Sequence, residues 1–266
     1  MTQLFFHSLA ATIALMPLMF LSHRREIRQE GVRRWLLLFV ALFGAASFAL
    51  AVNRNGWNPG FASSIWVSVS AVLLGYAVLA KVYPYAWGLV RLLMPYALFL
   101  ALIATIWSGT SASPPIDSPG PWLAIHLVLV VFAYAAATLG AIAGFGVFLQ
   151  ERALKAKKPT RLSRSLPSVL EGESLLIRLL MVAELVLLAG IFAGISELYV
   201  SQSQVMLFNH KTVFSLLAFV VLGAILLMHA RSGLRGKQAV RLLLVGYLFI
   251  TLAFPGVKLV SDVILA

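Results

Sequence analysis

Residues 121–137 read PWLAIHLVLVVFAYAAA, an apolar run that contains one imidazole side chain, that of His126. The run continues to about residue 149, which is longer than the roughly 20 apolar residues that a helix needs to cross a bilayer. The whole chain has the same character, because 61% of its residues are hydrophobic and only 11% are charged. A soluble domain carries about 25% charged residues. The sequence therefore predicts an all-α, polytopic integral membrane protein.

Runs of this kind recur along the 266 residues, and we count eight of them. They cover about 4–21, 35–52, 61–80, 85–107, 122–149, 174–196, 212–230 and 240–265. The third run contains four serines, which is acceptable because a serine hydroxyl can bond to a carbonyl of its own helix. We expect two membrane halves of four helices each, residues 1–110 and 111–266.

Basic residues concentrate in every second loop. SHRREIRQEGVRR contains five arginines, QERALKAKKPTRLSR six Lys or Arg, and ARSGLRGKQ three, and Lys81 follows the third run. The intervening loops contain at most one Lys or Arg each. By the positive-inside rule the basic loops are cytoplasmic, which places both termini outside, in the periplasm of a bacterial inner membrane. The net charge of +12 is then a topology signal. We expect membrane lipids, and no nucleic acid, as its partners.

Several kinds of chemistry are excluded or disfavoured. The chain has no cysteine, which excludes thiolate ligands, iron–sulfur clusters and covalent c-type haem attachment through this chain. The sequence shows no nucleophile–base pair, no phosphate-binding loop and no paired carboxylates at a common depth. We therefore expect that the protein is not an enzyme.

The histidines fall at two predicted depths. His126 lies about one turn inside the outer face, and His7 and His210 lie near that face. His229 and His23 lie at the inner face. With a rise of 1.5 Å per residue, His126 and His229 differ in depth by roughly 20 Å. Because imidazole is a common ligand of haem iron and other metals, both are candidate metal ligands, in separate sites.

Charged residues inside the predicted helices allow two interpretations. Glu184 lies in the middle of the run 174–196, and Arg91 lies in the same inner half of the membrane. In one interpretation Glu184 pairs with Arg91, and Arg91 or Arg178 holds a haem propionate. In the other, the arginines extend toward the inner interface and Glu184 is protonated.

Small and aromatic residues have expected structural roles. Gly140 with Gly144, and Gly190 with Gly194, are spaced i, i+4, which permits close approach of helices. Six tryptophans fall near the predicted interfaces, and for most of them we expect an aromatic belt. They are Trp57, Trp66, Trp107 and Trp122 on the outer side, and Trp35 and Trp87 on the inner side. Pro255 with Gly256 should kink the last helix.

Three segments together resemble a known family. They are HLVLVVFAYAAATLGAIAGFGVFLQERALK from His126 onward, then LPSVLEGES, then HKTVFSLLAFVVLGAILLMHARSGLRGKQAV from His210 onward. The ordered set resembles the cytochrome c assembly membrane-protein family of CcsA type, in its short branch typified by YpjD and HemX. The resemblance covers roughly residues 121–260, whereas residues 1–110 match only in hydropathy.

The resemblance implies non-covalent binding of haem b. His126 corresponds to the family's outer iron-ligating histidine, and His229 to the histidine that ligates a membrane-embedded haem. His7 or His210 could supply another outer ligand. Tyr134 follows His126 by eight residues, about 80° further around a helix, so it can line the same cavity. The family's tryptophan-rich outer platform and second outer histidine are absent, which argues against haem delivery to an apocytochrome.

Two functions follow from these observations. The first is a haem-binding inner-membrane protein that serves haem handling or cytochrome c assembly. The alternative is a non-catalytic accessory subunit of a membrane transporter or another integral membrane complex, in which the histidines are vestiges. The colour of the purified protein distinguishes the two.

Overall fold

The structure is a computed structural model, and it describes residues 2–22, 31–108, 115–117, 119–203, 210–232 and 236–260. Throughout these ranges the regular elements are helices, apart from one isolated bridge between Trp57 and Ile116. The predicted all-α class is confirmed. The chain divides into two compact units, Met1–Ser118 with Lys258–Ala266, and Pro119–Val257.

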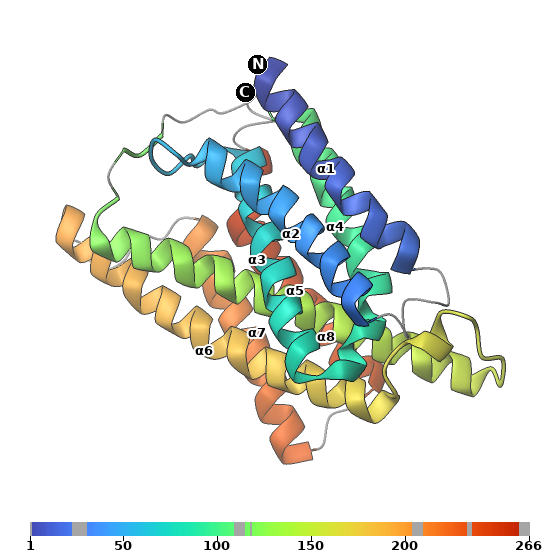
Figure 1. Cartoon of the computed structure of the whole chain (residues 1–266). Helices are drawn as coiled ribbons and strands as arrows, with labels where there is room; N and C mark the ends of the chain where they lie inside the picture. Colours follow the sequence, from blue (N-terminus) through green and yellow to red (C-terminus); the bar gives the residue numbers. More distant parts are fainter. Residues whose placement is uncertain are drawn as a thin grey trace. The chain divides into compact units, whose positions relative to one another are not determined.

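The first unit contains four long helices (Figure 1). Helix α1 contacts α2 and α4, and α3 contacts α2 and α4. A short 3₁₀ helix, η2, joins α3 to α4. The bounds are α1 Thr2–Ser22, α2 Gly31–Val52, α3 Phe61–Val82, η2 Pro84–Leu89 and α4 Val90–Ile106.

The second unit is built on α5, which lies along α6 (Figure 1) and also contacts α8. Helix α7 contacts α6 and α8. A 3₁₀ turn, η3, lies in the α5–α6 connection, and a π-helical segment, η4, follows α8. The bounds are α5 Pro121–Lys155, η3 Ser163–Ser165, α6 Val169–Gln202, α7 His210–Ser232, α8 Gly236–Thr251 and η4 Leu252–Gly256. The short helix α9, Val257–Leu259, begins at the last residue of this unit and continues into residues assigned to the first.

Seven helices in the described part of the chain are long and apolar enough to cross a membrane, as expected of a multi-pass membrane protein. The eighth predicted run, 240–265, contains a shorter apolar helix, Val240–Gly256, and its last residues lie outside the described ones. The count of eight, the side on which the termini lie and the halves 1–110 and 111–266 therefore stay predictions. Pro255 falls within the π-helical segment η4, an interruption of the kind that kinks helices.

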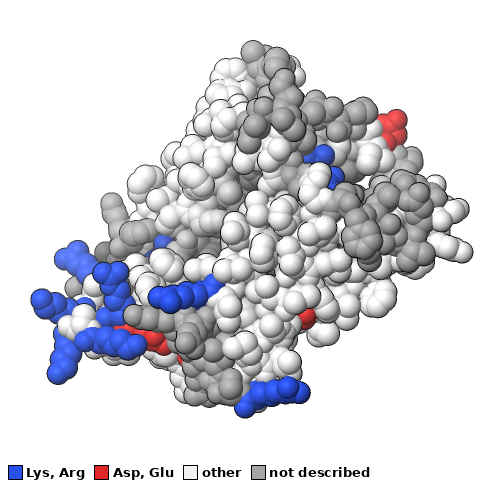
Figure 2. All heavy atoms as spheres, turned by 180° about the vertical axis from the view of Figure 1, so that it is seen from behind, with Lys and Arg blue, Asp and Glu red and all other residues white. Residues whose placement is uncertain are grey.

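Helices α5 and α6 are longer than the apolar runs predicted. They have 35 and 34 residues, and at 1.5 Å per residue each spans about 50 Å, more than the roughly 30 Å hydrocarbon core. A capping box starts α6, in which Ser168 Oγ accepts from Glu171 N and Glu171 Oε2 accepts from Ser168 N. The apolar runs stop where polar residues begin, whereas both helices extend further, into the α5–α6 connection. Lys and Arg side chains of this connection gather at the lower left of Figure 2.

A polar cluster lies inside the first unit. Trp66 is fully buried, and its Nε1 donates to Ser8 Oγ over 2.9 Å. Ser8 Oγ is also 2.8 Å from Thr105 Oγ1. Trp66 is thus a core residue and no member of an aromatic belt. The expected serine bonding in α3 is confirmed, because Ser68 Oγ donates to the Ser64 carbonyl over 2.7 Å.

Candidate functional site around His126

The start of α5 places His126. Gly120 is the N-cap residue, and Pro121 occupies the first helical position, where its missing N–H costs nothing and its fixed φ suits the helix. His126 follows in the second turn and is half-buried. The imidazole therefore projects from a rigid helix toward the neighbouring α6.

His126 Nδ1 lies 2.7 Å from the backbone carbonyl oxygen of Gly190 in α6. A carbonyl oxygen can only accept, so Nδ1 is the nitrogen that carries the hydrogen. In a neutral imidazole the other nitrogen, Nε2, then holds a lone pair. This is the arrangement of metal-ligating histidines, whose second nitrogen donates to a carbonyl or carboxylate that fixes the tautomer and the ring.

The glycine pair of α6 provides space for the imidazole. A Cβ on Gly194 would lie 3.0 Å from both Cε1 and Nδ1 of His126, whereas a Cβ on Gly190 would meet Leu129 Cβ at 3.6 Å. The first contact is too tight and the second is ordinary. Gly194 makes a close approach to α5, as expected, whereas a Cβ at Gly190 would fit, and the part of the pair in seating the imidazole was missed. The signal was available, since the pair lies on the helix that follows the histidine and at a similar predicted depth.

Tyr134 contacts a different helix from His126. Its ring is fully buried, its hydroxyl is 3.3 Å from that of Tyr247 in α8, and its ring centroid is 6.0 Å from that of Phe254. Thr138 Oγ1 donates to the Tyr247 hydroxyl over 3.2 Å. Tyr134 therefore belongs to the α5–α8 contact, and its role in a shared cavity with His126 stays a prediction.

The other histidines lie apart along the chain. His7 in α1 is half-buried, with its ring edge-on to Phe48 at 5.4 Å, and it belongs to the first unit. His210 begins α7 and is exposed, and His229 lies in the last turn of α7 and is half-buried. His23 lies outside the described residues. In the part of the chain that is described, no three His, Asp or Glu side chains gather as a metal cluster.

The intramembrane charges have separate local surroundings. Arg91 Nε donates to the Ser22 carbonyl over 2.6 Å, at the C-terminal end of α1. Glu184 Oε2 is buried and meets no hydrogen-bond partner among the described residues, and a Cβ on Gly223 of α7 would lie 2.9 Å from its Oε1. Arg178 is exposed on α6. Arg91 and Glu184 belong to different units, and their pairing stays a prediction.

Comparisons with known proteins extend the resemblance toward the N-terminus. The sequence model of a family described as "Cytochrome C assembly protein" matches residues 31–265, a wider range than residues 121–260. The chain is 39% identical over 272 residues to the "Uncharacterized 28.8 kDa protein in nifR3-like 5'region" of Azospirillum brasilense, covering 100% of both chains. No solved structure matches the chain.

Proposed function

We propose, because this chain belongs to the cytochrome c assembly protein family, that it binds haem b non-covalently and handles haem for cytochrome c biogenesis. Family membership supports involvement in cytochrome c biogenesis, and the seven apolar helices support a multi-pass membrane location. In this proposal the protein lies in the bacterial inner membrane, with His126 near the periplasmic face and His229 near the cytoplasmic face.

The hydrogen bond from His126 to Gly190 carries the proposal. In the neutral imidazole this bond leaves the lone pair on Nε2, and a neutral imidazole nitrogen is the commonest protein ligand of haem iron. When bound, haem would supply an iron that accepts an imidazole nitrogen as a ligand. His126 would donate its Nε2 lone pair, the Gly190 carbonyl would hold the ring, and Gly194 would leave room for it. The donor set therefore fits the group.

A second site is proposed around His229. This histidine closes α7 at the end that carries Arg231, so a group bound there would lie at the opposite membrane face from His126. Arg178 belongs to the same unit and is the better candidate for a propionate, because Arg91 Nε already donates to the Ser22 carbonyl in the first unit.

The experiment is purification of the full chain in detergent from haem-replete cells, with haem measured by its Soret band and by the pyridine haemochrome. We expect a histidine-ligated haem in the wild-type protein. The His126→Gly variant should lose outer-site haem and regain it when imidazole is added. A colourless wild-type protein that purifies with another membrane protein would instead favour the accessory-subunit function.

A further inference from the structure

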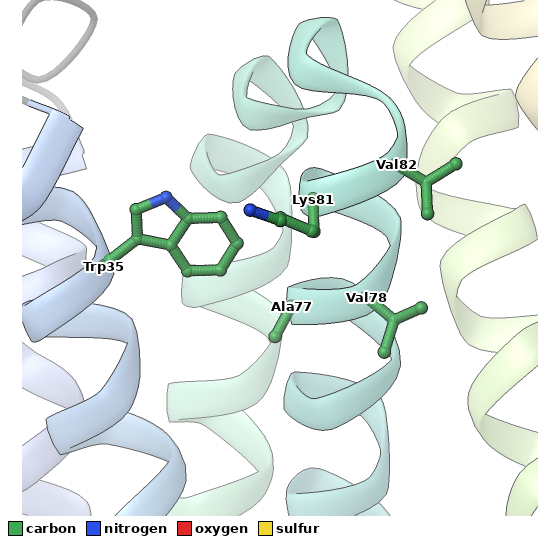
Figure 3. Close-up of a pocket in the computed structure, with 5 residues that line it drawn as sticks. All are labelled: Trp35, Ala77, Val78, Lys81 and Val82. Atoms are coloured by element: carbon green, nitrogen blue, oxygen red, sulfur yellow. The ribbon is translucent and has the colours of Figure 1, made fainter.

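A pocket of about 490 Å³ lies in the first unit, between the beginning of α2 and the end of α3 (Figure 3). Four of its lining residues are Trp35, Ala77, Val78 and Val82. The fifth is Lys81, whose ammonium group and the Trp35 ring point toward each other (Figure 3). Val78 and Val82 are each 58% exposed. The pocket is therefore apolar and open at the surface of the α2–α3 pair, and Lys81 is the one charged residue among the described residues that line it.

The Trp35 wall of the pocket is held in place by its neighbours. The Trp35 ring meets the Trp87 ring edge-on, with centroids 5.1 Å apart. The Arg34 guanidinium carbon lies 4.7 Å from the Trp87 ring centroid, and the Tyr76 hydroxyl donates to the Trp87 carbonyl over 3.3 Å. Because Trp87 and Tyr76 are buried, this wall exists before any ligand binds.

The polar groups around this wall are donors that lack acceptors. Arg34 Nε and Trp87 Nε1 are buried and meet no hydrogen-bond acceptor in the described part of the chain. Lys81 forms no ion pair with a described carboxylate, and none of the five lining residues is acidic. Buried donors normally find a partner. Arg34 and Trp87 do not line the pocket, but the Lys81 ammonium group beside apolar walls favours an anion that carries an apolar chain.

We propose that this pocket binds an anionic phospholipid, with an acyl chain against Val78 and Val82 and its phosphate beside Lys81. Trp35 and Lys81 lie in the terminal turns of α2 and α3, where membrane-spanning helices meet the headgroups. Lysine binds phosphate as a point charge, and tryptophan favours the interface. The lining contains no imidazole, phenol or thioether to ligate iron, so the pocket suits a lipid and is independent of the proposed haem sites.

The test measures quenching of Trp35 fluorescence by phospholipids with dibrominated acyl chains, in proteoliposomes of the full chain. Subtracting the Trp35→Phe signal isolates the contribution of Trp35. Dibrominated phosphatidylglycerol is compared with dibrominated phosphatidylcholine at equal mole fractions. We expect phosphatidylglycerol to be preferred about fivefold, the factor that one basic side chain near an anionic lipid supplies.

Matched variants separate this pocket from general surface charge. Lys81→Gln should abolish the preference, whereas Lys81→Arg should keep it. Val78→Phe, which fills the pocket without changing charge, should lower quenching by both lipids. Lys158→Gln removes the same charge from the exposed α5–α6 connection and should change nothing. Equal quenching by the two lipids in the wild-type protein, a preference that survives Lys81→Gln, or an equal loss in Lys158→Gln would each overturn the proposal.

Discussion

The imidazole of His126 donates from Nδ1 to the backbone carbonyl of Gly190 over 2.7 Å, from α5 to α6. The acceptor belongs to the backbone, so side-chain substitution at position 190 does not remove it. The bond fixes both the tautomer and the direction of the ring. The position of the imidazole therefore depends on helix packing, because the distance between α5 and α6 sets the length of the bond.

The two proposed haem sites should respond independently to mutation. His126→Ala should lower haem occupancy at the outer site and leave the signal that His229 supports, and His229→Ala should do the reverse. The reason is their placement, in the second turn of α5 and the last turn of α7. Haem content and the Soret spectrum of each purified variant check this. If both variants fold and neither changes haem content, the haem proposal is wrong.

The α6 glycines offer a matched pair of variants. Gly194→Ala puts a Cβ 3.0 Å from the His126 ring, whereas the Cβ of Gly190→Ala meets Leu129 at an ordinary 3.6 Å. We expect Gly194→Ala to displace the imidazole and weaken haem binding by about tenfold or more, the usual effect of disturbing the groups that orient a metal ligand. Gly190→Ala should bind nearly as the wild type does. Haem titration of the two apoproteins gives both affinities, and equal affinities would show that Gly194 does not seat the ring.

Hydropathy predicted which segments form helices, because each membrane-crossing helix needs a long apolar run whatever its neighbours are. It ended α5 at residue 149 although the helix continues to Lys155, and it began α6 at residue 174 although the capping box of Ser168 and Glu171 starts that helix before the apolar run. It also grouped Trp66 with interfacial tryptophans. The burial of Trp66 depends on Ser8 in a helix 58 residues away, and apolarity alone does not show such a partner.

The candidate site was predictable in part. A lone imidazole in an apolar helix indicates a functional or bonded group, and this singled out His126. Its partner was not predictable, because a backbone carbonyl has no sequence signature. The same limit applies to Arg91, whose Nε donates to the Ser22 carbonyl. A search for charge pairs considers only side chains, so it indicated Glu184 as a candidate partner, which stays a prediction, and could not indicate this carbonyl.

Glu184 and Gly223 should be energetically coupled. A Cβ at position 223 would lie 2.9 Å from Glu184 Oε1, so Gly223→Ala should destabilise the fold by about 1–3 kcal/mol, as overpacking does. In a Glu184→Ala background the carboxylate is gone, and Gly223→Ala should then cost little. A double-mutant cycle of denaturation midpoints in detergent measures the coupling. Additive effects would mean that the cost of Gly223→Ala does not come from its contact with the Glu184 carboxyl group.

The natural absence of cysteine permits a direct test of topology. Single cysteines can be placed at Lys157 in the α5–α6 connection, at Ser201 near the end of α6, and after Ala266. A membrane-impermeant maleimide applied to intact spheroplasts should label the Ser201 and C-terminal cysteines. It should label the Lys157 cysteine only after lysis. The basic loops predict this order, because Lys and Arg are retained on the cytoplasmic side.

Labelling of the C-terminal cysteine depends on the segment after α7, where Val240–Gly256 is shorter than the spanning helices and Pro255 lies in a π-helical turn. If that cysteine reacts only after lysis while Ser201 and Lys157 behave as expected, the last segment does not cross the membrane and the protein has seven spans. His126 and His229 would keep their opposite faces in that case, because both precede this segment, and the two-site proposal would stand. If instead the Lys157 cysteine reacts in intact spheroplasts, both sites exchange faces.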